Sequence, residues 1–340
     1  MTDLSTKLEI FDAIASRRNE RRSFLRFAGG SALAIGGATL LSACGSDDSD
    51  LAPTPTPGPA PVAALNDADV LNVALNLEYL EAQFYAFAAF GVGLNASLLT
   101  GIGTQGAVTG GAQVPFQDAV VREYAREIAI DEVAHVAFLR TALGSAAVAQ
   151  PAIDISVGTA AAPGAFTAAA RAAGVIGATG VFNPYADDNS FLLGAYIFED
   201  VGVSAYKGAA PLIANKTYLE AAAGILAAEA YHAGLIRTIL YRKGLQTPNP
   251  IPSLITAANQ ISDARDSLDG SSDDDQGITG SDPTISNIVP TDANGLAYSR
   301  SVAQVHNVVY LTPTAKIGGG FFPNGTNNRL DSLRTSGANA

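Results

Sequence analysis

The sequence has one cysteine, one methionine and no tryptophan among its 340 residues, and only 15% of the residues are charged. A single cysteine cannot form an internal disulfide or build a zinc or iron–sulfur site held by several thiolates. No basic run occurs outside the N-terminal region, and Asp and Glu outnumber Lys and Arg by 32 to 20. A non-specific nucleic-acid binder needs a basic face, so we expect no nucleic-acid partner. The hydrophobic fraction of 48% is large enough for a sizeable core.

The first 44 residues have the pattern of an export signal. Arg21 and Arg22 precede a mildly apolar, Gly- and Ala-rich stretch over residues 27–43, which resembles a bacterial twin-arginine signal. The stretch is short for a permanent membrane span. It ends in Leu-Ser-Ala directly before Cys44, and this is similar to the lipobox of bacterial lipoproteins, whose cysteine carries the lipid. The alternative is an ordinary cleaved signal with an incidental cysteine.

This resemblance implies a transport partner and a location. The chain would pass through the twin-arginine translocase and be lipid-anchored through Cys44 on the periplasmic or outer-membrane side of a Gram-negative envelope. We expect a signal at 1–44, a disordered Pro-rich tether at 45–64, a helical bundle at 65–246 and a C-terminal extension at 247–340. Without the signal, the chain has 14 basic and 28 acidic residues, and this excess of negative charge favours attraction of cations.

Four long segments rich in Ala and Leu, without internal proline, predict an all-α fold. They are expected at residues 65–90, 115–144, 190–210 and 215–244. Asn66 or Asp67 can cap the first segment and Gly91 can end it, while Pro115 suits the first turn of the second. The second and third are separated by about 40 residues, with a short helix expected at 165–173. This order of pair, long crossover and pair predicts a four-helix bundle.

The other connections are expected to be mostly irregular. Residues 92–114 are rich in Gly and Thr and predict a surface loop. After residue 246 the chain has three closely spaced prolines, and then a fifth helix is expected at 253–267. An acidic loop at 273–275 leads into a tail rich in Gly, Pro and Asn. The C-terminal extension is therefore predicted to be largely irregular after its helix.

The fourth segment is apolar on all sides over residues 221–236, except for Glu229, His232 and the Tyr231 hydroxyl. Such a helix is normally buried, and burial of a carboxylate without a partner costs several kcal/mol. Glu229 therefore needs a cation, a hydrogen-bond donor or a metal ion. His232 follows three residues later, so that both side chains project from one face of the helix.

The four segments form an internal two-fold repeat. The second repeats the Glu-x-x-His motif as Glu132 and His135, so two of the three histidines in the chain lie in this motif. Because seven residues make two helical turns, a Glu and a Tyr with that spacing share one stripe of a helix. The first and third segments have this pattern: Glu78 with Tyr85, and Glu199 with Tyr206. Satisfied polar groups in an Ala-rich core are the alternative interpretation.

One Glu from each of two helices and a Glu-x-x-His from each of the other two form the ligand set of di-iron and di-manganese carboxylate bundles. The chain resembles the ferritin-like superfamily, and specifically the ferritin-like family of bacteria and plants that includes desiccation-related proteins. The resemblance lies in residues 77–85, 131–135, 229–232 and 318–325. It implies an all-α ferritin-like four-helix bundle with a long crossover, a fifth helix and a largely irregular C-terminal extension.

The resemblance also implies a cofactor of two iron or manganese ions per chain. Four carboxylates match the charge of two divalent ions, and mixed carboxylate and imidazole ligands suit iron or manganese. The signal and the long extension distinguish the chain from ferritins, so a homo-oligomer is compatible with the sequence but a 24-subunit cage is not expected. The implied ligands are terminal Glu78 and Glu199, bridging Glu132 and Glu229, and His135 and His232 on one ion each.

Other residues near the motifs have less specific expectations. Glu81 lies three residues after Glu78, where it is either an additional ligand or a solvated charge. Tyr85 and Tyr206 either donate hydrogen bonds to ligand carboxylates or form part of the aromatic core. We expect solvated or supporting positions for the acids beside the motifs and no role for the isolated tail histidine: Glu127, Asp131, Asp200 and His306.

Two classes of function fit these residues. The first is an exported oxidoreductase that uses the six ligands as its catalytic centre and acts on O2 or peroxide in stress protection, as ferroxidases, rubrerythrin-like peroxidases and manganese catalases do. The second is a non-catalytic desiccation or envelope-stress protein that serves as a scaffold or metal buffer. A plain scaffold has no need of buried Glu and His, which favours the first class. Rubrerythrins usually add an iron site with four cysteines, and the single cysteine excludes that site here.

Lipidation can be tested at Cys44. The Cys44→Ala variant should lose the mass of a diacylglyceryl group, because no other cysteine can carry the lipid. Intact-mass spectrometry of protein extracted from the cell envelope measures this difference. Ser42→Ala, which keeps the cysteine, is the control, and a mass in Cys44→Ala that differs only by the sulfur atom of the replaced side chain would exclude the lipoprotein interpretation.

Overall fold

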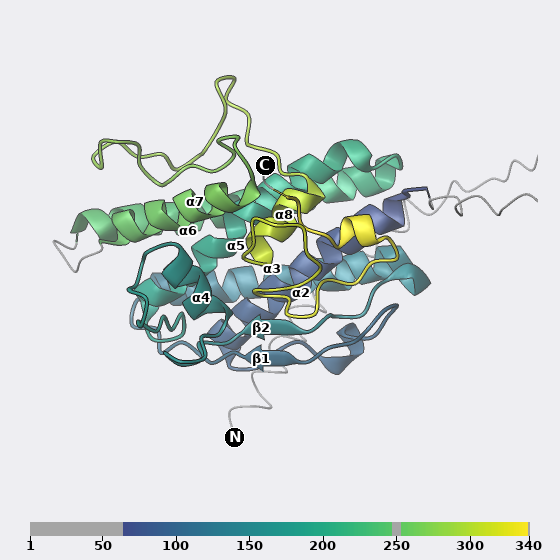
Figure 1. Cartoon of the computed structure of the whole chain (residues 1–340), viewed down its shortest axis with the longest axis horizontal. Helices are drawn as coiled ribbons and strands as arrows, with labels where there is room; N and C mark the ends of the chain where they lie inside the picture. The colour runs from purple at the N-terminus through teal and green to yellow at the C-terminus, as the bar shows by residue number, and fades with distance from the viewer. Residues whose placement is uncertain (1–63, 247–252, 339–340) are drawn as a thin grey trace, which may run out of the picture.

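The computed structural model describes residues 64–246 and 253–338 (Figure 1). The predicted signal with Arg21, Arg22 and Cys44, and nearly all of the predicted tether, lie outside the described residues. The core is built by four long helices: α2 (Asp67–Phe90), α3 (Ala119–Leu143), α5 (Asp188–Ala209) and α6 (Lys216–Gln246). Helix α2 packs against α3 and α5 packs against α6, and contacts of α2 with α5 and of α3 with α6 join the two pairs. The predicted all-α bundle is therefore confirmed.

Side-chain caps explain where α2 begins and ends. The Asn66 side chain accepts a hydrogen bond from the backbone N–H of Asp69, and the Asp69 carboxylate accepts one from the N–H of Asn66. This reciprocal pair satisfies two backbone donors that the first helical turn leaves free. Gly91 ends the helix in the left-handed region at φ 72°, where a residue without Cβ is favoured.

Helix α3 begins later than the sequence predicts. Residues 115–117 are not helical, and Asp118 is the cap, accepting hydrogen bonds from the N–H groups of Val120 and Val121. The backbone N–H groups of Gln117 and Asp118 are bound by the Asp188 carboxylate at 3.1 to 3.3 Å. A contact with the start of α5 thus holds this segment outside the helix, and the prediction of a start near Pro115 was wrong.

The two long connections meet in a small sheet that the sequence did not predict. Strand β1 (Val108–Gly110) lies between α2 and α3, and β2 (Ile153–Ile155) follows α3. They pair in parallel, with Val108 opposite Ile153 and Gly110 opposite Ile155. The same crossover contains α4 (Ala165–Ala172), which confirms the short helix expected at 165–173.

The C-terminal extension packs along the bundle. Helix α7 (Leu254–Asp269) confirms the predicted fifth helix, begins after the capping Ser253 and contacts both α5 and α6. Helix α8 (Val302–Val309), which was not predicted, packs against α5. Further along, the buried Phe321 ring lies 4.9 Å from Phe198 and 5.3 Å from Phe166, measured between ring centroids. The extension is thus part of the hydrophobic core.

The tail returns to the first helix of the bundle. The Asn327 N–H donates to Asn76 Oδ1 and Asn76 Nδ2 donates to the Asn327 carbonyl, both at 2.8 Å. The Asn327 side chain also donates to the carbonyls of Thr104 and Ala149. One tail residue therefore binds α2 and both connections that carry the strands.

Helix α6 is not buried on all sides in the single chain. Glu229 and His232 are buried, but Ala223 and Ala227 are exposed and Tyr231 is 77% exposed. The sequence predicted a buried helix, and this holds in the single chain only for the side that faces α3, α5 and α7. Among the described residues, no helix is long and apolar enough to span a membrane.

Candidate metal centre

Each long helix brings one glutamate to the middle of the bundle, and none is more than 1% exposed: Glu78 on α2, Glu132 on α3, Glu199 on α5 and Glu229 on α6. The Glu-x-x-His spacing places a histidine one turn further along α3 and α6. These histidines, His135 and His232, are 5% and 3% exposed. The structure thus brings all six residues proposed from the sequence into one buried cluster.

The ligand atoms form two groups that share one residue. Within each group the atoms lie within 4.8 Å of one another, which is close enough to surround a single ion. Glu229 belongs to both groups, and the two imidazole ring centroids are 6.3 Å apart. The groups are Glu78, Glu132, His135 and Glu229 in one half, and Glu199, Glu229 and His232 in the other.

Glu132 lies between the two histidines. Its Oε2 is 3.5 Å from His135 Nδ1, and its Oε1 is 3.1 Å from His232 Nδ1. By contrast, Glu78 Oε2 lies 3.1 Å from His135 Nδ1, and Glu199 Oε2 lies 3.7 Å from His232 Nδ1. Glu132 therefore lies within reach of both histidines, while Glu78 and Glu199 each face one of them.

Two tyrosine hydroxyls connect the helix pairs across the centre. Tyr85 on α2 donates a hydrogen bond to Glu199 Oε1 on α5, and Tyr206 on α5 donates one to Glu78 Oε1 on α2. The sequence placed each tyrosine on the stripe of its own helix's glutamate, but the hydrogen bond crosses to the other helix. Each bond occupies one carboxylate oxygen and leaves the Oε2 atom facing a histidine. Both alternatives are observed, because the two tyrosines donate hydrogen bonds to carboxylates of the cluster and their rings also lie in the hydrophobic core.

Burial raises the pKa of most of these carboxyl groups. It raises the pKa of Glu78 to about 7 and that of Glu199 to about 8, and the pKa of Glu229 lies well above its ordinary value. Glu132 differs, because the two histidines outweigh its burial and hold its pKa well below its usual range. Without a metal ion, protons must therefore neutralise much of the cluster.

The histidines are held in the protonated form by the same carboxylates. Burial alone would lower the pKa of His135, but Glu78 and Glu132 raise it to about 10. Burial also opposes the charge on His232, whose pKa is raised to about 11 by Asp131 and Glu132. A divalent ion would replace these protons as the positive charge of the centre.

The buried oxygen and nitrogen atoms of the cluster are suited to a metal ion. Buried polar atoms almost always have a hydrogen-bond partner. Within the described part of the chain, six buried atoms of this cluster have no hydrogen bond: both carboxylate oxygens of Glu132 and of Glu229, Glu199 Oε2 and His232 Nδ1. Five of them lie 3.1 to 3.7 Å from an oppositely charged partner atom within the cluster, and Glu229 Oε2 has no such contact. They are carboxylate and imidazole atoms, which suit iron or manganese. The cluster is therefore a candidate metal site.

Glu81 is buried beside the ligands. It is 5% exposed, which excludes the solvated position considered from the sequence. A Cβ added to Gly202 would lie 2.3 Å from Glu229 Oε2 and 3.4 Å from Glu81 Oε1, so both carboxylates approach this glycine. Burial and the neighbouring carboxylates raise the pKa of Glu81 well above its ordinary value. Its atoms fall outside both ligand groups.

The acids beside the motifs have three different surroundings. Asp131 Oδ2 lies 3.4 Å from His232 Nε2, a contact that orients the imidazole ring. Asp200 is buried in ion pairs with Arg237 and Arg265, and Glu127 is exposed. His306 is buried away from the centre and has hydrogen-bond partners in Val302 and Thr326.

Gly202 lies beside the carboxylate cluster, and the sequence did not predict this position. It lies on α5 three residues after Glu199, one turn along the face that looks into the centre. A glycine inside a long helix costs about 0.5–1 kcal/mol relative to alanine. A glycine at this cost inside a helix, three residues after Glu199, is the sequence feature that could have indicated a close approach of other side chains at this position.

Comparison with known proteins agrees with this geometry. The ferritin-like domain family matches residues 66–242. The chain is similar to the ferritin-like catalase Nec2 of Nesocodon mauritianus, with 27% identity over 78% of this chain and 84% of the relative. It is also similar to the desiccation-related protein PCC13-62 of Craterostigma plantagineum, with 29% identity over 69% of this chain and 75% of the relative. No solved structure matches the chain.

The space at Gly202 leads to a prediction for Gly202→Ala. The added methyl group should favour the helix by about 0.5–1 kcal/mol but displace the Glu229 carboxylate and lower the metal content. Elemental analysis and denaturant unfolding of the same samples measure the two effects. Gly224→Ala on α6 is the control, because nothing lies within 4 Å of its added Cβ. Full metal content in Gly202→Ala would contradict the assigned position of Glu229.

The raised pKa values predict that metal binding releases protons. At neutral pH both histidines are positively charged imidazolium groups, since the pKa of His135 is about 10 and that of His232 about 11. A histidine that binds a metal ion must be neutral, so each has to lose one proton. Full loading should therefore release at least one proton per histidine, and affinity should fall as the pH is lowered. Calorimetric titrations in buffers of different ionisation enthalpy count the protons. Binding without proton release would show that the histidines are already neutral.

Proposed function

The chain belongs to the ferritin-like domain family, and we propose that it is an exported member with a dinuclear iron or manganese centre that reacts with peroxide or O2 in stress protection. The observation that carries this proposal is the set of six buried polar atoms left without hydrogen bonds among the predicted ligands. Leaving such atoms without hydrogen bonds costs free energy, which the contacts with the histidines at 3.1 to 3.7 Å offset only in part. Binding of metal ions would remove that cost.

Each half of the bundle would hold one of the two metal ions. Such ions alternate between two oxidation states and can exchange electrons with small oxidants. The chain contributes orientation, because the Tyr85 and Tyr206 hydroxyls hold the outer oxygens of Glu199 and Glu78. The Glu81 carboxyl, whose pKa is raised, can hold a proton beside Glu229. The ligands proposed are Glu78 and His135 for one ion, Glu199 and His232 for the other, and Glu132 and Glu229 for both.

Peroxide is the favoured oxidant. In its disproportionation one H2O2 gives two electrons and becomes O2, while a second accepts them and becomes water, so no external reductant is needed. This suits a chain whose single cysteine cannot build an electron-delivery site of four thiolates. The similarity to a protein named as a ferritin-like catalase also supports a reaction with peroxide.

A second candidate is a non-catalytic protein that buffers metal or stabilises the envelope during drying. The similarity to a protein named as desiccation-related supports it. A scaffold alone, however, has no use for five buried carboxyl groups, because each must be paired or protonated. The redox function is therefore preferred.

We further propose export by the twin-arginine translocase and attachment to a membrane through a lipid on Cys44. Arg21, Arg22 and the residues before Cys44 support this location. The twin-arginine route carries folded proteins, so the centre could be loaded in the cytoplasm before export. The acidic balance of the mature chain suits attraction of cations.

Metal content is the decisive test of the proposed function. Elemental analysis of protein purified from its native envelope should find about two iron or manganese ions per chain, and oxygen release from peroxide should follow the metal content. Glu132→Ala/Glu229→Ala should lose both metal and activity, because it removes the shared ligands. The matched control is Glu127→Ala/Glu220→Ala, which removes two exposed glutamates from the same helices. Absence of metal from the unmodified protein, with equal thermal stability of the ligand variant, would favour the scaffold.

A further inference from the structure

The repeated Glu-x-x-His motif continues to an arginine in both halves of the chain. Arg140 follows His135 by five residues, and Arg237 follows His232 by five. Each arginine reaches the other helix of its own pair, at the residue that directly follows the glutamate ligand. These residues are Tyr79, after Glu78 on α2, and Asp200, after Glu199 on α5.

In the first half, Arg140 joins α3 to α2. Its Nη1 donates to the Tyr79 hydroxyl at 2.5 Å and to the Thr100 carbonyl at 2.6 Å. Tyr79 is fully buried, and burial raises the pKa of its hydroxyl, which stays protonated and lies 2.8 Å from the Leu98 carbonyl. Arg140, which lies on α3, thus binds α2 and the connection between the two helices.

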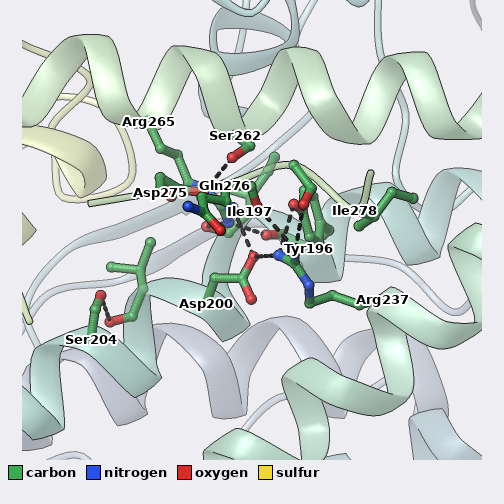
Figure 2. A network of polar contacts seen from close by, with 12 residues as sticks. Tyr196, Ile197, Asp200, Ser204, Arg237, Ser262, Arg265, Asp275, Gln276 and Ile278 are labelled. Carbon is green, nitrogen blue, oxygen red and sulfur yellow. Dashed lines mark hydrogen bonds and ion pairs between the residues drawn. The ribbon is translucent and has the colours of Figure 1, made fainter. Parts of the chain in front are cut away.

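In the second half, Arg237 joins α6 to α5. Its Nη1 donates to Asp200 Oδ2 at 2.7 Å, and Arg265 on α7 donates to the same oxygen at 2.8 Å. Figure 2 shows Asp200 and both arginines within one network of polar contacts. The Nη2 atom of Arg237 donates to three carbonyls of the C-terminal extension, those of Gln276, Gly277 and Asn287.

The two contacts share their position but not their chemistry. The acceptor is a neutral hydroxyl in one half and a carboxylate in the other, and the outer carbonyls belong to a loop in one half and to the extension in the other. In both halves an arginine follows the histidine of the Glu-x-x-His motif by five residues. In both halves it also contacts the residue next to the glutamate on the other helix of its pair. A role tied to the ligands explains this shared feature, whereas general stabilisation of the fold would not require the same position in both halves.

Neighbouring helix residues point about 100° apart. Glu78 therefore faces the centre while Tyr79 faces the flank of the same helix pair. A guanidinium group with two directed hydrogen bonds can fix both the rotation and the sliding of one helix against the other. We propose that Arg140 and Arg237 are positioning residues, which hold Glu78 against His135 and Glu199 against His232, respectively. This inference rests on the proposed metal centre.

The test uses the full chain after removal of metal, with histidine labelled by ¹⁵N. Only three histidines occur in the sequence, so the imidazole resonances can be followed one by one, with His306 as the internal reference. Arg140→Met should shift the His135 resonances and leave those of His232 unchanged, and Arg237→Met should do the opposite. Arg171→Met is the control, because Arg171 donates to loop carbonyls beside α4 and should shift none of them.

Milder variants guard against loss of the fold. Arg140→Lys keeps the charge but not the paired hydrogen bonds, and Tyr79→Phe removes only the accepting hydroxyl. Both should reproduce the selective shift of His135 and weaken binding of one of the two ions by about 10–100-fold. Resonances equal to those of the unmodified protein, or equal shifts of both histidines, would overturn the positioning role even if thermal stability falls. If the unmodified chain holds no metal, the proposed function fails, but the histidine spectra still decide this inference.

Discussion

The structure depends on the neutralisation of buried negative charge. Five carboxyl groups and two imidazoles lie in the middle of the bundle, within a core that consists mostly of apolar side chains, where an isolated charge is costly. In the metal-free chain, protons carried by the histidines and by most of the carboxyls provide this balance. Every helix of the bundle contributes to the cluster, so the packing of the helices and the charge of the centre cannot be separated.

The internal repeat places the same charge-neutralising contacts in both halves of the bundle. Within each helix pair a histidine faces a glutamate, and between the pairs a tyrosine hydroxyl holds the far oxygen of that glutamate. Glu132 reaches both histidines, and Glu229 belongs to both ligand groups. The two halves are nevertheless unequal at their edges, where Tyr79 takes the place that Asp200 has in the other half.

The sequence predicted most features that depend on local rules. The caps of α2, the short helix in the crossover and the fifth helix follow from patterns within one segment. The six clustered side chains were expected from a motif repeated in four segments together with the resemblance to ferritin-like bundles. It did not predict features set by distant segments. The start of α3 depends on Asp188, strand β1 has its partner more than 40 residues away, and Glu81 is buried by helices that converge only in the folded chain. The export signal remains a prediction, since its residues lie outside the described part.

The contact between Asn327 and Asn76 has a consequence for the order of folding. These residues are separated by 251 positions, and a segment of the chain cannot reach its partner until it has left the ribosome. The Asn76 side-chain oxygen on α2 therefore acquires this hydrogen bond only after residue 327 has been synthesised. Long-range contacts of this kind slow folding. A chain interrupted before residue 327 would therefore contain all four long helices but lack the contact that binds the tail to α2.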